Sequence, residues 1–394
     1  MHAFKYLLII NGLCMAAMMS FAAVVGPLVR TLSLAEWHGG VAVTIAGVLW
    51  LLSARAWGRL SDGHGRKQVI GWGVLGFSLS YLMLAAYFDW AQRMTMPLLV
   101  VLTLMVVLRG LMGLFYAAVP VVSGAWMADH FPPQARRGVM AKLGAANAIG
   151  MVVGPLVAGM LATRSLSLPL YLAALLPILA GALLWWKVPA TAVVPRDEKP
   201  ALAFADRRVR LPVIAMFLAT SAVFAAQMCV GFFAMDRLAL DAQGGAKVAG
   251  QTMAGVGITL ILVQMAVARL HQISPQRLIG FGALLAAAGF APLLLTTSAF
   301  GLIGSYCLAA AGLGMVFPAA QALAANSVEA GEQGLAAGTL SAAQGLASVV
   351  SPLTFTLLYQ WYWLLPYLLA CALLCILSML AIRESTRSCT VPSL

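Results

Sequence analysis

Charge is what this sequence most lacks. Only 9% of its 394 residues are Asp, Glu, Lys or Arg, against about 25% in an ordinary soluble domain, while 62% are hydrophobic. A folded soluble chain of this size needs a solvated surface, which so few charges cannot provide. The deficit excludes a soluble enzyme, a nucleic-acid-binding protein and a disordered scaffold, and it indicates a protein that crosses a membrane several times.

Residues for metal or redox chemistry are equally sparse. The six cysteines form no CxxC pair and lie mostly in apolar runs, and the five histidines are scattered near loops and helix ends. We expect the thiols to act as small buried hydrophobes, with no metal site and no cofactor. An enzyme would need clustered acids, histidines or a nucleophile–base pair near one membrane interface, and the sequence holds no such cluster, so we expect no enzymatic activity.

Apolar runs dominate what remains. A membrane-spanning helix needs about 20 apolar residues, and twelve runs meet that length. The first is too long for the core of a secretory signal, which has about 7–15 residues, so we expect a retained helix. The fold class is therefore an all-α integral membrane protein. The expected spans are 4–29, 38–57, 69–88, 96–127, 138–162, 167–188, 211–235, 248–270, 277–296, 300–326, 334–359 and 363–382.

The Lys and Arg residues lie mostly in loops on one side of the membrane. With both termini in the cytoplasm, 18 of the 24 Lys and Arg face inward, five face outward, and Arg109 lies within a span. The excess of inward positive charge favours this orientation. The net charge of +12 therefore reflects membrane topology, and no nucleic-acid partner is expected.

The polar stretch 189–210 divides the chain into two matched halves. It predicts an N-terminal six-helix bundle (1–188), a central cytoplasmic loop (189–210) and a C-terminal six-helix bundle (211–394). The halves echo each other, because Asn147 precedes Pro155 by eight residues as Gln344 precedes Pro352. Two pseudo-symmetric bundles are one repeat arrangement of secondary transporters, whose substrate site lies near the midplane.

Residues 58–67 read GRLSDGHGRK. The glycines permit a tight reversal, and Asp62 can pair with basic neighbours or cap a helix. An ordinary basic turn is one interpretation. The string also resembles the signature loop of the major facilitator superfamily, GxLaDrxGrkxxl, with Gly63 where that family has a basic residue. In the family this loop locks the cytoplasmic side, which implies conformational roles for Gly58, Asp62, Gly65 and Arg66.

Two further stretches narrow the resemblance. Residues 108–113, LRGLMG, resemble the RxxxG motif of that family through Arg109 and Gly113, and residues 150–159, GMVVGPLVAG, resemble its antiporter motif through Gly154 and Pro155. A glycine-rich packing seam is the simpler interpretation, because small residues four apart let helices approach closely and proline favours a bend.

Glu332-Gln333-Gly334 is similar to members that export tetracycline and other drugs. The motifs together resemble the twelve-helix drug:proton antiporter branch. This implies a monomeric exporter of the bacterial inner membrane. It would move a small molecule by alternating access, with the proton gradient as its energy source and the lipid bilayer as its surroundings.

Arg109 carries the sharpest expectation. A charge at a helix centre costs at least about 2.5–3.5 kcal/mol and marks a functional site by default, although a structural partner is the alternative. In the family this arginine is implicated in proton transfer. None of the twelve carboxylates lies mid-span, and Asp62, Asp129 and Asp236 at span ends remain candidates for coupling. The missing acid favours an anionic substrate, for example a carboxylate siderophore, that would supply a bidentate partner.

Helices 1, 4, 7 and 10 face the central cavity in that family, which implies a set of mid-span polar and aromatic residues for substrate binding. For each Asn or Gln, an interhelical hydrogen bond is an equal alternative. An importer or facilitator of a polar solute, and a membrane receptor or scaffold, also remain open. The expected binding residues are Asn11, Arg109, Tyr116, Asn147, Phe224, Gln227, Tyr306, Gln321 and Gln344.

Overall fold

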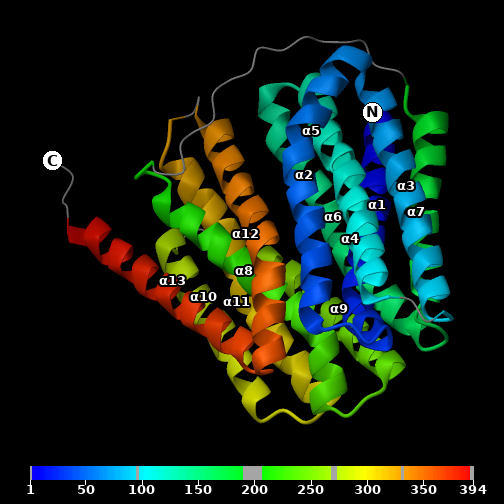
Figure 1. The fold of residues 1–394 in the computed structure, drawn as a ribbon. Coiled ribbons are helices and arrows are strands. Elements are labelled where there is room, and N and C mark those ends of the chain that lie inside the picture. The colour runs from blue at the N-terminus through cyan, green and yellow to red at the C-terminus, as the bar shows by residue number, and fades with distance from the viewer. Residues whose placement is uncertain (1, 95–96, 190–205, 268–272, 330–331, 391–394) are drawn as a thin grey trace. The chain divides into compact units, whose positions relative to one another are not determined.

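The chain folds into helices throughout the part that the structure describes. That structure is a computed structural model, and it describes residues 2–94, 97–189, 206–267, 273–329 and 332–390 (Figure 1). Its elements in chain order are α1 (His2–Thr31), α2 (Glu36–His64), α3 (Arg66–Ala91), α4 (Leu98–Tyr116), α5 (Ala118–His130), α6 (Pro133–Ala162), α7 (Leu168–Lys187), α8 (Arg210–Arg237), α9 (Ala242–Val267), α10 (Pro275–Phe290), the 3₁₀ turn η1 (Ala291–Leu294), α11 (Ala299–Asn326), α12 (Gln333–Trp361) and α13 (Leu365–Thr390).

Twelve helical segments in the described residues are long and apolar enough to cross a membrane, which confirms the expected number of spans. Helices α4 and α5 form one of them, Leu98–His130, with a break at Ala117. The break follows from Pro120, which has no N–H to donate to the carbonyl of Tyr116 four residues earlier. The all-helical, twelve-span class predicted from composition is therefore confirmed.

Two helix boundaries differ from those predicted from the sequence. The stretch 58–67 was expected to form a loop, but α2 continues to His64 and α3 begins at Arg66. The reversal is made by Gly65 alone, whose φ of 89° is open to glycine and costly for other residues. The span expected at 277–296 becomes α10 followed by η1, which begins one residue before Pro292.

Contacts divide the chain into two compact units. The first comprises Met1–Asp197 and Val230–Ala254, and the second comprises Glu198–Cys229 and Gly255–Leu394. The first unit thus includes the adjoining ends of α8 and α9 as well as the six N-terminal spans. The expected central loop lies largely at 190–205, outside the described residues, and the expected bundle boundaries stay a prediction.

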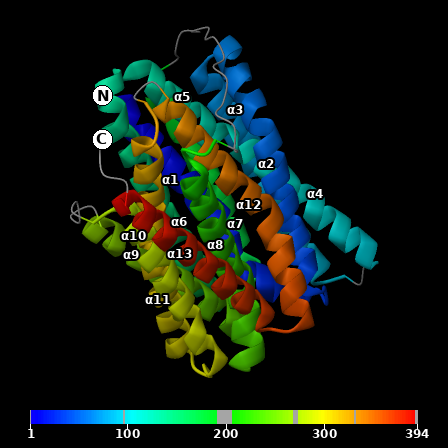
Figure 2. The same ribbon diagram turned by 90° about the vertical axis from the view of Figure 1, so that its left-hand side faces the viewer.

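Within the first unit, α1 packs on α6 and α7, and α2 packs on α4 (Figures 1 and 2). Two motif glycines set these distances. A Cβ on Gly154 would lie 2.2 Å from the carbonyl oxygen of Ala16 on α1, and a Cβ on Gly113 would lie 2.1 Å from that of Ala46 on α2. Only glycine fits at these positions, because the obstructing atoms belong to the facing backbone.

Within the second unit, α10 packs on both α11 and α13. Gly289 and Gly312 allow the α10–α11 approach, since a Cβ on either would lie within 2.4 Å of backbone atoms of the other helix. The buried rings of Phe290, Tyr306 and Tyr367 fill the space where α10, α11 and α13 meet.

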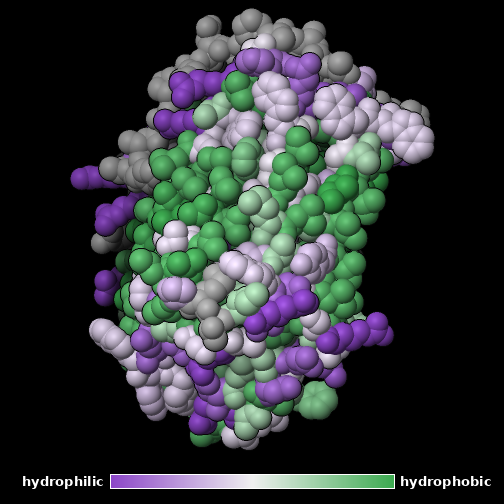
Figure 3. Space-filling model, turned by 45° about the vertical axis from the view of Figure 1, so that its right-hand side comes forward, coloured by the Kyte–Doolittle hydropathy of each residue, from purple (hydrophilic) through white to green (hydrophobic). Residues whose placement is uncertain are grey.

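The surface has the pattern of a protein solvated by lipid. On the face shown in Figure 3, apolar side chains form a broad band, and hydrophilic side chains gather beyond its ends. Large apolar side chains such as Leu75, Leu179 and Leu262 are more than half exposed on the helices. Water would not favour such exposure, whereas hydrocarbon does.

Candidate functional site

Arg109 lies on α4 in the interior of the first unit, only 3% exposed. Its guanidinium carbon sits 4.1 Å from the centre of the Phe21 ring on α1. Its Nη1 is 3.7 Å from the sulfur of Met112 and 4.0 Å from that of Met18. A cation over an aromatic face is attracted by the ring quadrupole, and thioethers are weak acceptors.

This setting leaves the arginine short of acceptors. Its Nε is buried with no hydrogen-bond partner, and no carboxylate lies within ion-pair distance of it in the described part of the chain. A guanidinium offers five N–H donors in a planar fork. The arrangement therefore has unused capacity to bind an anion or a strong acceptor, and the binding role of Arg109 stays a prediction.

Asn11 and Tyr116, expected to bind substrate, are engaged in interhelical contacts. The Nδ2 of Asn11 donates to the carbonyl of Leu7 and to the hydroxyl of Ser123 on α5, at 2.8 Å each. The hydroxyl of Tyr116 lies 3.6 Å from the sulfur of Met15 on α1. Both residues join α1 to the α4–α5 span, and their binding role stays a prediction.

Asn147 is the second polar group with unused capacity in the first unit. It lies on α6, and its Oδ1 is buried without a hydrogen-bond partner among the described residues. Its neighbour Ala146 contacts α1 at Gly12, where a Cβ would lie 3.1 Å from the Ala146 carbonyl oxygen. A buried amide oxygen without a donor is costly, so a ligand donor at this position would recover free energy.

The residues at 58–67 build an ion-pair cluster. Arg66, 4% exposed, lies 2.6 Å from Asp62 and 2.9 Å from Asp129, the latter on α5. It also donates to the hydroxyl of Ser61. The cluster ties the ends of α2 and α3 to the end of α5. Gly58, in contrast, lies close only to Val121, at 3.9 Å from a built Cβ.

A second cluster lies at the other end of α2, and sequence reading missed it as a unit. Arg30, near the end of α1, is 2.6 Å from Glu36 and 3.0 Å from Asp236 near the end of α8. Its guanidinium carbon also lies 5.7 Å from the centre of the Phe232 ring. The only signal in the sequence was that these charges sit at span ends. The two clusters lie about 40 Å apart along α2 at 1.5 Å per residue.

The antiporter-like motif on α6 faces two helices. Gly154 meets α1 at Ala16, and its carbonyl accepts a hydrogen bond from Ser20 at 3.2 Å. One turn later, Gly159 lies against Gly250 of α9, where a Cβ would come within 2.7 Å of the Gly250 Cα. The carbonyl of Pro155 similarly contacts Gly250. The motif is a close-packing seam, as the simpler interpretation held, and its coupling role stays a prediction.

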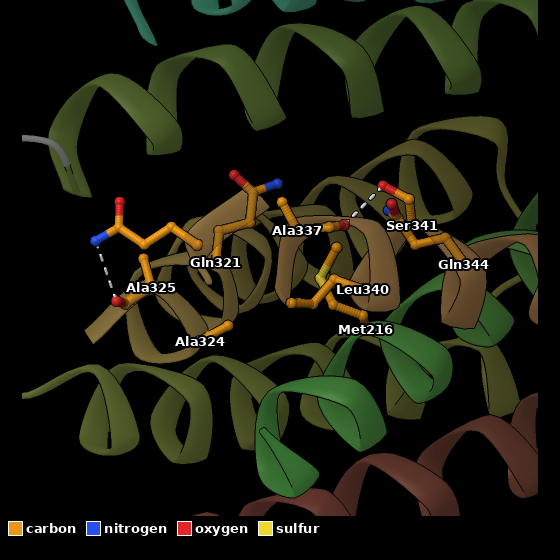
Figure 4. Close-up of a pocket in the computed structure, with 9 residues that line it drawn as sticks. Met216, Gln321, Ala324, Ala325, Ala337, Leu340, Ser341 and Gln344 are labelled. Atoms are coloured by element: carbon orange, nitrogen blue, oxygen red, sulfur yellow. Dashed lines mark hydrogen bonds between the residues drawn. The ribbon is translucent and has the colours of Figure 1, made fainter. Parts of the chain in front are cut away.

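In the second unit, α8, α11 and α12 enclose a pocket of about 240 Å³ (Figure 4). Two expected binding residues, Gln321 and Gln344, line it, and their amides have no hydrogen-bond partner among the described residues. Seven further lining residues were not predicted as binding residues, and among them Met216, Gln333 and Ser341 are the ones with sulfur or polar side chains. The lining combines three uncharged amides and one hydroxyl with apolar side chains such as Met216 and Leu340, so it suits a neutral hydrogen-bonding group.

Three expected residues of the second unit lie outside this pocket. The hydroxyl of Tyr306 donates to the carbonyl of Ala226 at 3.3 Å and shares a 2.9 Å hydrogen bond with Tyr367. This buried network joins α11, α8 and α13. Phe224 and Gln227 are half-buried on α8.

Outside the spans, Arg208 joins the start of α8 to the start of α12. It lies 2.9 Å from Asp206 and 2.7 Å from Glu332, a residue of the exporter-like triplet 332–334. Hydrogen bonds from Arg208 lower the pKa of both carboxyls, and the same bonds raise the pKa of the arginine. All three groups are therefore charged at neutral pH.

Two curated proteins are similar in sequence to this chain. The tetracycline resistance protein class C of Escherichia coli is 29% identical over 339 residues, covering 82% of this chain and 80% of its own. The staphyloferrin B transporter of Staphylococcus aureus is 27% identical over 173 residues, covering 43% of this chain and 38% of its own.

Among solved structures, an inward-facing bacterial homologue of the human lysosomal transporter Spinster superposes with a TM-score of 0.72. It is 15% identical and covers 97% of this chain and 92% of its own. The family model described as Major Facilitator Superfamily matches residues 7–299 and 216–388, nearly the whole chain. With twelve spans, the signature turn at Gly65 and the fold in agreement, the chain belongs to the Major Facilitator Superfamily, a family of membrane transporters and not of enzymes.

Proposed function

We propose that this multi-pass protein of the bacterial inner membrane exports a small molecule in exchange for protons, by alternating access. The observation that carries the proposal is the likeness to a tetracycline resistance protein over about four fifths of both chains. We further propose that both termini face the cytoplasm, because that orientation places 18 of the 24 Lys and Arg inside.

Coupling to protons has to work without a carboxylate in mid-span. The two arginine clusters are the candidates, because they hold carboxylates at both ends of the first unit. In the cytoplasmic cluster Arg66 holds Asp62 and Asp129, and in the outer cluster Arg30 holds Glu36 and Asp236. Alternating access would break and re-form these ion pairs in turn, which makes their four carboxylates the candidate groups for coupling.

Transport in inside-out vesicles tests the proposal. The vesicles are energised until the lumen is acidic, and lumenal pH is followed by a fluorescent dye while compounds are added. Proton release on adding a tetracycline-like compound is the expected result. Asp236→Asn should abolish the release. The control is Asp89→Asn, which breaks an exposed ion pair with Arg93 near the C-terminal end of α3 and should leave the release intact. Uptake of labelled compound without proton movement would refute proton exchange.

A second candidate function is export of an anionic compound, favoured by Arg109. Its buried fork has an aromatic ring and two thioethers for neighbours, with a free Nε. A cargo carboxylate would supply the missing acceptor. The partial likeness to a staphyloferrin B transporter supports this candidate. In the vesicle assay, a carboxylate-rich chelator should then release protons and Arg109→Ala should not respond to it, whereas a response confined to permanent cations would exclude anionic cargo.

A further inference from the structure

A cluster of aromatic and basic side chains lies at one end of the first unit, where α3 begins and α7 ends. We call it the interfacial cluster, and its members are His64, Lys67, Trp72, Trp185, Trp186 and Lys187. The three indoles are 41%, 58% and 80% exposed, in chain order. Exposed indoles at span ends are typical of the membrane–water interface, and neither the candidate binding residues nor the two ion-pair clusters include these three.

The cluster is held in place by specific contacts. Lys67 Nζ donates to the carbonyl of Trp185 at 3.1 Å and lies 5.3 Å from the centre of its ring. The ring of Trp185 packs on α3 at Gly71, where a Cβ would lie 3.2 Å from the indole Cζ2. Lys187 Nζ lies 4.1 Å from the Trp186 ring centre. The lysines are thus positioned against rigid aromatic walls.

Positive charge in the cluster is not neutralised. Neither Lys67 nor Lys187 forms an ion pair with a carboxylate in the described part of the chain. Lys67 uses one of its three N–H donors on the carbonyl of Trp185, and Lys187 is exposed. Two ammonium groups with free donors beside exposed indoles suit a phosphate-bearing anion.

Apolar tracks lead from this cluster along both helices. On α3 the exposed side chains Trp72, Leu75, Leu79 and Met83 follow at intervals of three or four residues, so they share one helix face. On α7 Leu175 and Leu179 lie on the approach to Trp186. A free phosphate has no use for these tracks, whereas acyl chains would cover them.

We propose that the interfacial cluster is a binding site for an anionic phospholipid. The phosphate lies between Lys67 and Lys187, the indoles flank the headgroup region, and the acyl chains run along α3 and α7. A bound lipid bridges the N-terminal end of α3 to the C-terminal end of α7. It thereby steadies the residue next to Arg66, and so the cytoplasmic ion-pair cluster.

Native mass spectrometry of the purified full chain, titrated with phosphatidylglycerol or phosphatidylcholine, tests this site. We expect tighter binding of phosphatidylglycerol. Each lysine within an anionic lipid site contributes about a fivefold gain in affinity, so Lys187→Gln should weaken binding about fivefold and the double variant with Lys67→Gln about 25-fold. Replacement of both lysines by arginine should retain binding, because the charge remains.

Matched controls separate the site from general surface charge. Arg383→Gln removes an exposed charge near the end of α13, and Trp361→Leu removes an exposed indole at the end of α12; both should bind as the unaltered chain does. Equal binding of the two lipids, or unchanged affinity in the double variant with an unaltered melting temperature, would overturn the proposal. Competition by soluble glycerol phosphate would also overturn it, since the headgroup alone would then suffice.

Discussion

Replacing Gly154 by alanine adds a single methyl group between α6 and α1, and we expect it to destabilise the protein. The added Cβ would lie 2.2 Å from the Ala16 carbonyl oxygen and 3.0 Å from both the carbonyl carbon and the Cα. These are backbone atoms, so no side-chain rotation relieves the overlap. The helices would have to separate by about 1 Å to restore ordinary contact distances.

The magnitude follows from two opposing contributions. Alanine is a better helix former than glycine by about 1 kcal/mol, which favours the variant. Overpacking in an interior costs about 1–3 kcal/mol, and an obstruction by backbone belongs at the upper end of that range. The net loss is about 2 kcal/mol, or about 4–8 °C in melting temperature for a unit of this size.

Thermal unfolding followed by a thiol-reactive dye measures this once the other five cysteines are replaced by alanine, because the remaining Cys14 on α1 is fully buried and reacts when the first unit opens. Gly124→Ala on α5 is the matched control. A Cβ there meets nothing within 4 Å, so this variant should melt at or slightly above the temperature of the unaltered chain. If Gly154→Ala has the same melting temperature as the control variant, α1 and α6 are not in the close contact described, and the argument fails.

Three further outcomes are expected. Asp129→Asn removes one of the two carboxylates on the buried Arg66 and should lower stability by about 2 kcal/mol, seen as a lower melting temperature. Glu332→Gln should reduce the stability that the protein loses on acidification. Arg208 holds the pKa of Glu332 below its ordinary value, so the ion pair stabilises the fold at neutral pH and this stabilisation is lost as the pH falls through the lowered pKa. Melting temperatures at pH 7 and at pH 3 measure the difference. Tyr306→Phe removes a buried hydroxyl shared with α8 and α13, and a loss of about 1 kcal/mol should appear in the same melting assay.

Hydropathy and motifs predicted the spans well because membrane insertion is a local property of sequence. Twelve runs became twelve spans, and the wrong boundaries fell where a local feature competes with helix formation. At 58–67 the glycines and charges resembled a loop, yet one glycine at φ 89° was enough for the reversal. At Ala117 a break appeared inside an uninterrupted apolar run, because Pro120 acts three residues away.

The candidate site was predicted only in its residue types. Arg109 stood out because a charge within a span is costly, but Phe21 as its neighbour depends on how α1 packs on α4. The pairing of Arg66 with Asp129 joins residues 63 positions apart, and that of Arg208 with Glu332 joins residues 124 apart. No periodicity encodes such pairs, because they are set by tertiary packing.

The pairing of α1 with α6 has a consequence for how the chain is made. Ser20 on α1 bonds to the carbonyl of Gly154, which is synthesised 134 residues later, and Asn11 bonds to Ser123, which is synthesised 112 residues later. At a synthesis rate of about 5–20 residues per second, the first of these delays lasts about 7–27 seconds. Throughout that interval α1 is already complete, its polar side chains are limited to hydrogen bonds within α1, such as Asn11 to Leu7 and Ser20 to Ala16, and its interface with α6 is unfilled. The newly made α1 must therefore be accommodated by the insertion machinery or the bilayer until α6, five helices later, is made.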